Sequence, residues 1–373
     1  KDYSLGGITL LCKFDGQRVT MASQIAGADE TVSSLYSVKS EQATMLSFDT
    51  YNYLVHYFGQ PQGSMADDPN GTLGGDYEFV ISDATADRIE LKGKKYGNRI
   101  VMKAFSADQT WKQYLTRIKK VEDDAFFYEY DLRMDGLYTG QMLRSNYTFI
   151  VTYYDEVGKV YQKTVPFMFT TDGMRFHEPV TIDGQTMQNF VWKNEEISFV
   201  CTDEGATGVK MKGIYIDGYQ SYDYYPGTYL MDFYRLNGAT NQLEVASQEI
   251  QLVKNEDGKS YWLKGLEYDI LVTYDKPRGG LSILPQFLKK VQGGYVYLAM
   301  WDLMNDYVLR SSAIGLISYP TTDGIYLVDN GVWMGEISGF IFGVYDSQDE
   351  EASFMGYTDA VAAIRLIKKT IEE

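Results

Sequence analysis

The residues best suited to contact a ligand are tyrosines that gather in one short segment. The chain has 32 tyrosines, and six of them lie close together with two aspartates, at Tyr215, Asp217, Tyr219, Tyr222, Asp223, Tyr224, Tyr225 and Tyr229. Flat aromatic rings beside carboxylates suit sugars, because a ring stacks on C–H groups while phenol and acid groups bind hydroxyls. The alternative is structural, since tyrosine also favours strands and forms cross-strand pairs.

The conformation of this segment decides which rings are available to a ligand. In an extended strand, alternation sends Tyr222 and Tyr224 to one face and Tyr225 to the other. We therefore expect Tyr222 and Tyr224 to bind the ligand, with Asp223 at the rim. If the segment is a loop, Tyr225 joins them, because the residue before a proline, here Pro226, is pushed towards extended backbone.

Catalytic motifs do not stand out from the sequence. The chain has two histidines, His56 and His177, far apart along it, and neither forms a His-Glu-x-x-His motif or has a Gly-x-Ser-x-Gly partner. The sequence also lacks a phosphate-binding glycine loop. We expect both histidines to be structural, and we assign no catalytic residue and no cofactor.

Carboxylates are abundant, with 51 Asp and Glu residues. A glycoside hydrolase needs two of them facing each other at about 5 to 10 Å, and the nearest candidates are Asp217 with Asp223 and Glu195 with Glu196. We expect these to be solvated surface acids. The acidic loop at 67–76 offers oxygen ligands for calcium but lacks the Asp-x-Asp-x-Asp-Gly order and the bidentate Glu, so we assign no metal site.

Charge and composition exclude some classes of function. The formal net charge is −17 and no run of basic residues longer than a pair or triplet stands out, so a nucleic-acid partner is not expected. The two cysteines, Cys12 and Cys201, sit in apolar alternating segments and are expected to be buried free thiols. No apolar stretch approaches the roughly 20 residues of a membrane-spanning helix. A start at Lys1 is typical of a processed chain, which leaves secretion open.

Most of the chain alternates between apolar and polar residues, the pattern of strands. Residues 8–14 and 17–21 predict a hairpin around Asp15-Gly16. A phrase at 170–176, Thr-Thr-Asp-Gly-Met-Arg-Phe, returns at 321–327 as Thr-Thr-Asp-Gly-Ile-Tyr-Leu, which predicts a repeated unit. The fold class is therefore mainly β: antiparallel β-barrel or sandwich units in tandem, lipocalin-like or calycin-like, with a few short helices.

Helices are expected at few places. An apolar stripe behind a Ser106 cap predicts a helix over 106–122 that bridges two domains. Ser47 is a candidate cap for a short helix or strand end at 51–58, and 283–291 is a further helix candidate. The segment 360–369 fits either a helix or a strand.

These elements divide the chain into a first β unit at 1–105, the bridging helix at 106–122, a second β unit at 123–216 and a third at 217–373. The second and third units are either separate or packed as one C-terminal domain.

Several phrases along the chain are distinctive: Val38-Lys39-Ser40, residues 46–52, His56-Tyr57-Phe58, residues 75–79, residues 91–95 and the phrase at 172–179. Together they resemble a family of Bacteroidetes surface lipoproteins of unassigned function, the domain-of-unknown-function family 4302. The resemblance implies an exported protein, held at the cell surface or outer membrane by a lipid anchor outside this chain. It also implies outer-membrane import components as partners, and it transfers no catalytic residue.

The function expected from these observations is a non-enzymatic surface lipoprotein that binds a nutrient ligand, with a glycan favoured over a peptide or haem. The alternative is a structural or adhesive surface module without a small-molecule site. A glycoside hydrolase is the third hypothesis. The arrangement of the tyrosine rings distinguishes the first two, and the third requires a carboxylate pair in a cleft.

Overall fold

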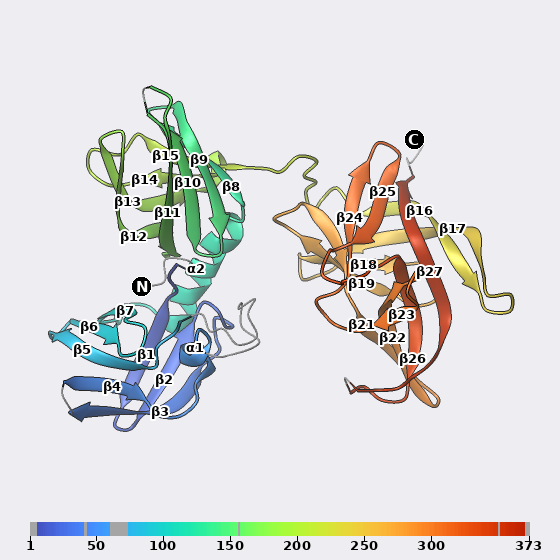
Figure 1. Cartoon of the computed structure of the whole chain (residues 1–373), viewed down its shortest axis with the longest axis horizontal. Helices are drawn as coiled ribbons and strands as arrows, with labels where there is room; N and C mark the ends of the chain where they lie inside the picture. Colours follow the sequence, from blue (N-terminus) through green and yellow to red (C-terminus); the bar gives the residue numbers. More distant parts are fainter. Residues whose placement is uncertain (1–5, 41–42, 60–73, 156, 350, 370–373) are drawn as a thin grey trace. The chain divides into compact units, whose positions relative to one another are not determined.

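The computed structural model describes residues 6–40, 43–59, 74–155, 157–349 and 351–369. The chain divides into two compact units, Lys1–Tyr215 and Ile216–Glu373 (Figure 1). Both are built almost wholly of antiparallel strands. The predicted fold class is confirmed.

The first unit opens with a seven-stranded antiparallel sheet whose strands follow chain order. The strands are β1 (Leu10–Asp15), β2 (Arg18–Ser23), β3 (Val32–Ser40), β4 (Thr44–Phe48), β5 (Glu78–Ala84), β6 (Arg88–Gly93) and β7 (Arg99–Lys103). A short helix, α1 (Tyr53–His56), brings Leu54 and Val55 into the same core as Met21, Leu46 and Phe79. The helix is capped by Asn52, whose side chain accepts from the Leu54 N–H, and not by Ser47 as expected.

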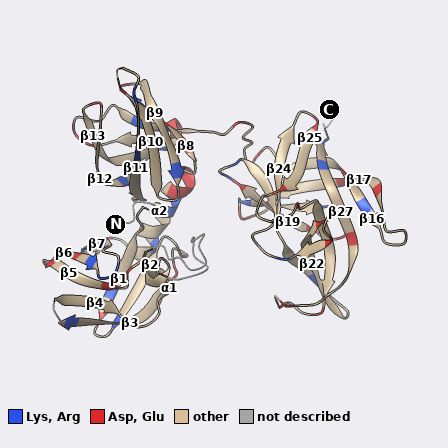
Figure 2. Ribbon diagram, in the orientation of Figure 1, with Lys and Arg blue, Asp and Glu red and all other residues tan. Residues whose placement is uncertain are grey.

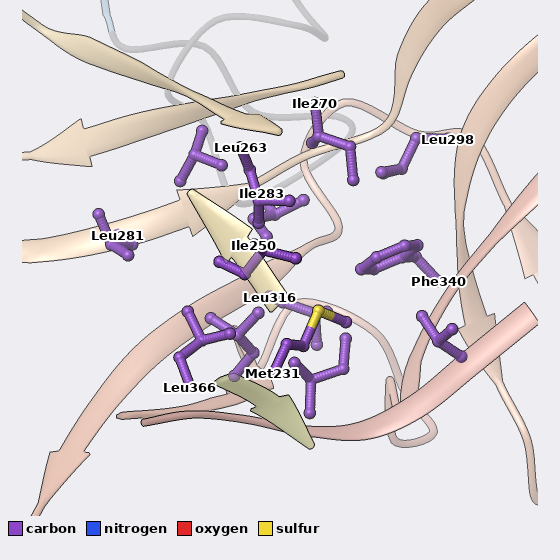
Figure 3. Packing of buried hydrophobic residues seen from close by; sticks show 14 of the residues in the cluster. Met231, Ile250, Leu263, Ile270, Leu281, Ile283, Leu298, Leu316, Phe340 and Leu366 are labelled. Atoms are coloured by element: carbon purple, nitrogen blue, oxygen red, sulfur yellow. The ribbon is translucent and has the colours of Figure 1, made fainter. Parts of the chain in front are cut away.

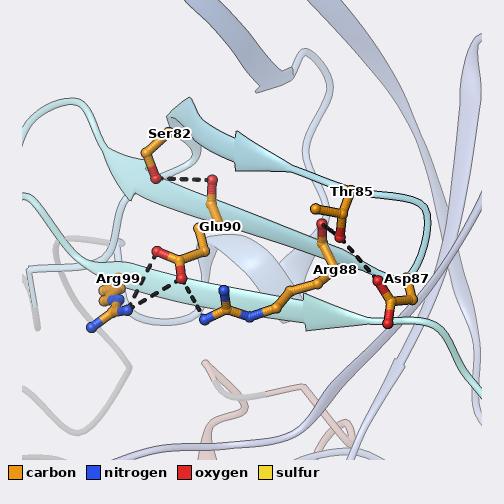
Figure 4. Close-up of polar contacts among 6 residues, drawn as sticks. All are labelled: Ser82, Thr85, Asp87, Arg88, Glu90 and Arg99. Atoms are coloured by element: carbon orange, nitrogen blue, oxygen red, sulfur yellow. Dashed lines mark hydrogen bonds and ion pairs between the residues drawn. The ribbon is translucent and has the colours of Figure 1, made fainter.

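Two local details of this sheet follow from turn and surface chemistry. The predicted first hairpin forms, but Asp15 pairs with Arg18, so the turn residues are Gly16 and Gln17. The turn is shifted by one residue because Gly16 carries the positive φ, 60°, at the first turn position. On β6, Glu90 pairs with arginines of its own and the neighbouring strand (Figure 4). Such exposed pairs contribute at most about 1 kcal/mol each.

Helix α2 (Trp111–Asp124) joins the sheet to the barrel that follows. The helix was predicted, but its cap is Thr110, which forms a reciprocal capping box with Gln113, and not Ser106. Leu115 packs against the sheet, while Ile118 and Val121 belong to the core of the barrel. The helix thus connects two hydrophobic cores through one apolar stripe.

The rest of the first unit is a closed antiparallel barrel of eight strands. They are β8 (Glu129–Met134), β9 (Leu137–Ser145), β10 (Thr148–Tyr154), β11 (Val160–Phe169), β12 (Gly173–Ile182), β13 (Gln185–Lys193), β14 (Ser198–Cys201) and β15 (Val209–Ile214), with a 3-10 turn at Asn194–Glu196. The inward positions carry large aromatic rings, including Phe149, Phe167 and Phe199, which are fully buried. The interior is therefore a packed core.

The second unit contains another ring of eight strands, because the first strand of the unit pairs with the last. The ring consists of β16 (Gly227–Asn237), β17 (Gln242–Lys254), β18 (Ser260–Lys264), β19 (Ile270–Asp275), β20 (Gly280–Ile283), β24 (Leu316–Thr321), β25 (Gly324–Asp329) and β27 (Phe354–Lys368). The long strand β27 also starts a second layer, made of β26 (Gly339–Tyr345), β22 (Gly294–Asp302), β21 (Gln286–Val291) and β23 (Tyr307–Leu309).

Side chains from the ring and from the second layer fill one core. Met231, Ile250 and Leu316 of the ring lie close to Leu298 and Phe340 of the second layer (Figure 3). The same topology corrects two expectations. The segment 283–291 is not a helix, because it contains the end of β20 and all of β21, and the ambiguous C-terminal segment is strand β27.

The repeated phrase forms a similar hairpin turn twice, between β11 and β12 and between β24 and β25. In each turn the threonine hydroxyl donates to the aspartate, Thr170 to Asp172 at 3.0 Å and Thr321 to Asp323 at 2.5 Å. After the hairpin the two copies diverge. Strand β12 pairs next with β13, the strand that follows it, whereas β25 pairs with β27 and not with the following strand, β26. The likeness thus ends after the hairpin, and the prediction of a repeated unit is wrong.

Candidate functional site

The tyrosine-rich segment closes over the core of the second unit. Residues 221–226 form turns and not an extended strand, so the alternation expected for them does not apply. Tyr225 is fully buried and its hydroxyl donates to the Gly279 carbonyl oxygen at 2.7 Å. Tyr229 is also buried and donates to the Tyr225 carbonyl oxygen at 2.7 Å. Tyr225 is therefore a core residue, and its expected place on a ligand-facing surface is corrected.

Tyr222 is held by several contacts within the same unit. Its hydroxyl donates to the Ser260 carbonyl oxygen at 2.8 Å, and its ring stacks on Tyr261 with centroids 4.7 Å apart. Lys254 lies 5.3 Å from the ring centroid and pairs with Asp223. The hydroxyl and the ring of Tyr222 thus make most of their contacts within the protein.

Tyr224 is the most exposed ring of the four expected ligand-binding residues, at 39%. Lys368 lies over its ring at 4.9 Å and donates to its backbone carbonyl oxygen. Tyr224 and Asp223 are thus the members of the predicted site that reach the surface. Their binding role stays a prediction.

The histidines occupy packed positions. His56 Nδ1 lies 2.8 Å from the Asn52 carbonyl oxygen, and its ring stacks on Tyr77. His177 lies on the exposed side of β12 beside the chain at Gly7, where an added Cβ would come 2.4 Å from its Nε2 atom. The two histidines are placed by different elements and share no contact partner in these interactions.

Two of the four candidate carboxylates, Asp223 and Glu196, form ion pairs with lysines. Glu196 pairs with Lys210 at 2.6 Å, and both signs of charge are interspersed along the strands (Figure 2). Most of the acidic loop at 67–76 lies outside the described residues, but Asp76 is buried and accepts from the Lys95 and Tyr96 N–H groups and from Asn98. Among the described residues no group of three or more His, Cys, Asp or Glu side chains is arranged to hold a metal ion.

The two thiols are free. Cys12 is half-buried and Cys201 is buried. Burial raises the pKa of Cys12 to about 12 and that of Cys201 to about 11. Both thiols are therefore protonated at neutral pH, which makes them poor nucleophiles.

An aromatic groove on the outside of the second unit was not expected from the sequence. It has a volume of about 480 Å³ and is formed by β18, the loop that follows it, and β21. Its lining residues are Trp262, Lys264, Glu267, Tyr268, Asp269, Leu288 and Lys289. Strand β21 is held next to β19 by the Gln286 amide, which accepts from the Leu271 N–H at 2.8 Å and donates to its carbonyl oxygen at 2.9 Å.

The groove combines an aromatic face with charged groups. Trp262 is 36% exposed, while its neighbours Tyr261 and Leu263 point into the core. The Lys264 ammonium group lies 3.8 Å from the Asp269 carboxylate. The ring of Tyr268 packs in a T-shaped arrangement against Phe342 of the core, with centroids 5.2 Å apart, which ties this lining residue to the core. One feature of the sequence could have indicated this groove: in the alternating pattern of the strand, Trp262 occupies a position that faces outward.

Two family models match this chain. A model described as a domain of unknown function (DUF4302) matches residues 1–194. The chain belongs to the DUF4302 family. A second model, also described as a domain of unknown function (DUF4987), matches residues 202–341, the region that contains the aromatic groove. The matched segments correspond to most of the first unit and most of the second.

Other comparisons add little to this assignment. No curated protein matches the chain. A crystal structure of a protein of unknown function from the DUF3598 family of Nostoc punctiforme covers 66% of this chain and 98% of its own, at 7% identity and a TM-score of 0.17. A likeness at that score supports no structural argument. No helix among the described residues is long and apolar enough to cross a membrane.

Proposed function

We propose that the protein is a surface-exposed, non-enzymatic binding protein whose ligand is a glycan, bound in the groove at Trp262. The observation that carries the proposal is an exposed indole ring at a groove rimmed by Glu267 and Asp269. An indole face stacks on the C–H groups of a sugar ring, and carboxylates accept hydrogen bonds from its hydroxyl groups. One exposed ring with several charged groups around it would stabilise a bound peptide or haem less than a bound glycan.

The exposure of the acids supports binding over hydrolysis. A glycoside hydrolase keeps one carboxyl group protonated at neutral pH by removing it from water. Glu267 and Asp269 are both exposed, and the Asp269 carboxylate lies 3.8 Å from the Lys264 ammonium group. Neither acid has the surroundings of a general acid.

The location and partners are proposed from the family resemblance. The protein is exported and lipid-anchored at the cell surface or outer membrane of a Bacteroidetes bacterium, and it works with outer-membrane import components. Binding a glycan at the surface would supply such components with their substrate.

A structural or adhesive module is the second candidate, and one observation favours it. Both barrels have packed interiors, which contain Phe167 and Phe199 in the first and Ile250 and Leu316 in the second. A lipocalin-like ligand would need that interior space. A spacer needs packed cores and nothing more, so the groove at Trp262 decides between the candidates.

A glycan array on the whole protein, followed by calorimetry on any glycan that binds, tests the proposal. Because stacking on the indole ring is lost, we expect Trp262→Ala to weaken binding by about 1 to 3 kcal/mol, roughly tenfold or more. Tyr319→Ala, an exposed ring on β24, is the matched control and should bind normally. Tyr224→Ala tests the tyrosine segment in the same assay.

Four results separate the hypotheses. Normal binding by the Trp262 variant would exclude the groove, and loss of binding by the Tyr224 variant would move the site to the tyrosine segment. A wild-type protein that binds nothing on the array would favour the structural module. Release of sugars from a bound glycan would instead establish the hydrolase.

A further inference from the structure

Strand β17 has an edge that no other strand covers. It pairs with β16 from Gln242 to Leu252, but with β18 only from Gln251 to Lys254. At Gln248 the side-chain amide donates to the Gly265 carbonyl oxygen, which covers the middle of the strand. The backbone of 242–247 is thus left without a strand partner on that side, within the part of this unit that the structure describes.

The side chains of residues 242–247 do not block the pairing of this edge with another strand. An open edge attracts another strand, and proteins usually block it with lysine, proline or a covering element. Strand β7, an edge of the first sheet, carries Arg99 and Lys103, and β21 carries Lys289 and Lys290. The segment 242–247 contains no lysine, arginine or proline.

The outward face of the segment is apolar. Val245 is 78% exposed, and its cross-strand neighbour on β16, Tyr234, is 44% exposed. Leu243 is exposed on the same face, two residues along the strand. An exposed apolar row next to unpaired backbone groups offers both side-chain contacts and hydrogen bonds to an added strand.

We propose that this edge pairs with the same edge of a second copy of the chain, in antiparallel register about Val245. A two-fold axis there places Val245 opposite Val245 of the partner subunit, and Leu243 opposite Ser247 of the partner subunit. Glu244 then faces Ala246 of the partner subunit, so the carboxylates do not meet. Across the axis, Tyr234 and Val245 of one copy therefore lie next to Val245 and Tyr234 of the other. This contact buries Val245, the most exposed valine of the strand.

The charges select this register over its neighbour. An axis at Glu244 would set two carboxylates directly opposite each other, which is unfavourable. An axis at Ala246 would set Leu243 opposite a glutamate, Glu249 of the partner subunit. The axis at Val245 avoids both arrangements and joins two apolar rows. This proposal is independent of the glycan site, because the groove residues lie on β18, its following loop and β21.

Analytical ultracentrifugation of the whole protein over a range of concentrations tests the dimer. We expect the wild-type chain to reach twice the mass of one chain. Val245→Lys should be monomeric at concentrations where the wild type is dimeric, because two ammonium groups would face each other at the axis. The matched control is Val332→Lys, the same substitution at a 56% exposed valine of the same unit, which should leave the dimer intact.

Cross-linking tests the register without depending on how well the lysine variant folds. In an antiparallel pair, residues at the axis have Cα atoms within the range of a disulfide. Val245→Cys should therefore form a covalent dimer on oxidation, and Thr240→Cys, at the hairpin turn, should not. A monomeric wild-type chain would overturn the proposal and leave the edge to a strand of another protein. A dimer that survives Val245→Lys, or that is not cross-linked by Val245→Cys, would also overturn it.

Discussion

At the scale of single residues, the tyrosines of the second unit show how a polar aromatic residue serves a core. Their hydroxyls donate to backbone carbonyl oxygens, as Tyr225 does at Gly279 and Tyr222 at Ser260. A buried phenol needs such a partner, and a backbone carbonyl oxygen can accept a second hydrogen bond beside one from a backbone N–H. Composition shows that the rings gather; it does not show which of them find a carbonyl group inside.

Gly324 gives a prediction at the same scale. Its φ is +146°, and a Cβ there would lie 2.8 Å from the Leu366 carbonyl oxygen on β27. We expect Gly324→Val to lower the free energy of unfolding by about 1 kcal/mol or more, because valine resists that backbone conformation and has no space. Urea unfolding measures the loss. Gly238→Val, at a turn with open space around it, should change stability by no more than about 0.5 kcal/mol; equal effects at both positions would contradict the reasoning.

At the scale of elements, the tyrosine-rich closure of the second barrel makes stability depend on alkaline pH. Burial raises the pKa values of Tyr222, Tyr225, Tyr261 and Tyr274 above the ordinary value of 10. In the first unit, burial raises the pKa of Tyr147 to about 12. The folded protein therefore holds these protons more tightly than the unfolded chain does.

The sign of the effect follows from that difference. The stability contributed by these tyrosines is fully present below about pH 10 and is lost as the pH rises from there through about 12. We expect the urea midpoint to fall over that window, together with a rise in phenolate absorbance. A midpoint that stays constant from about pH 9 to pH 12 would show that these rings titrate as free tyrosines. Changing Tyr222 to Phe should remove part of the pH dependence.

Strands and helices were predictable from the sequence wherever one face of the element is apolar and the other is polar. The hairpin at 8–21 and the helix with Trp111 and Leu115 follow from their periods of two and 3.6 residues. The strand in segment 283–291 was missed because contacts with other strands determine its conformation. The Gln286 side-chain amide, for example, hydrogen-bonds the backbone N–H and carbonyl groups of Leu271 on β19. The first turn was shifted by one residue because Gly16 decides its position and Asp15 does not.

The groove could not be predicted as a site because its walls come from separate elements. Trp262 lies on β18, Asp269 in the following loop and Leu288 on β21, and only the sheet pairing brings them together. The alternation of apolar and polar residues predicts that Trp262 points outward, but it does not predict which residues of other elements lie beside it. The tyrosine segment, in contrast, is compact in the sequence, but only Tyr225 and Tyr229 of its six tyrosines are buried in the core.

At the scale of the whole molecule, each of the two compact units has its own hydrophobic core. We expect fragments 1–215 and 216–373 to fold separately, with cooperative thermal transitions by circular dichroism, because a domain with its own core can fold alone. The full chain should then show transitions near those of the fragments. A fragment that stays unfolded while the full chain is folded would show that one unit depends on the other.

The pairing of β16 with β27 has a consequence for how the second unit is made. The barrel closes between the first strand of the unit and the last, at pairs such as Tyr229 with Lys368. During synthesis, β16 leaves the ribosome long before its partner exists, and the ring cannot close until β27 has emerged. Nascent chains at that stage expose unpaired strands, which is when aggregation competes with folding. Chaperone dependence in the cell should therefore fall on the second unit, and a chain that stops before Phe354 would leave that barrel open because it lacks β27.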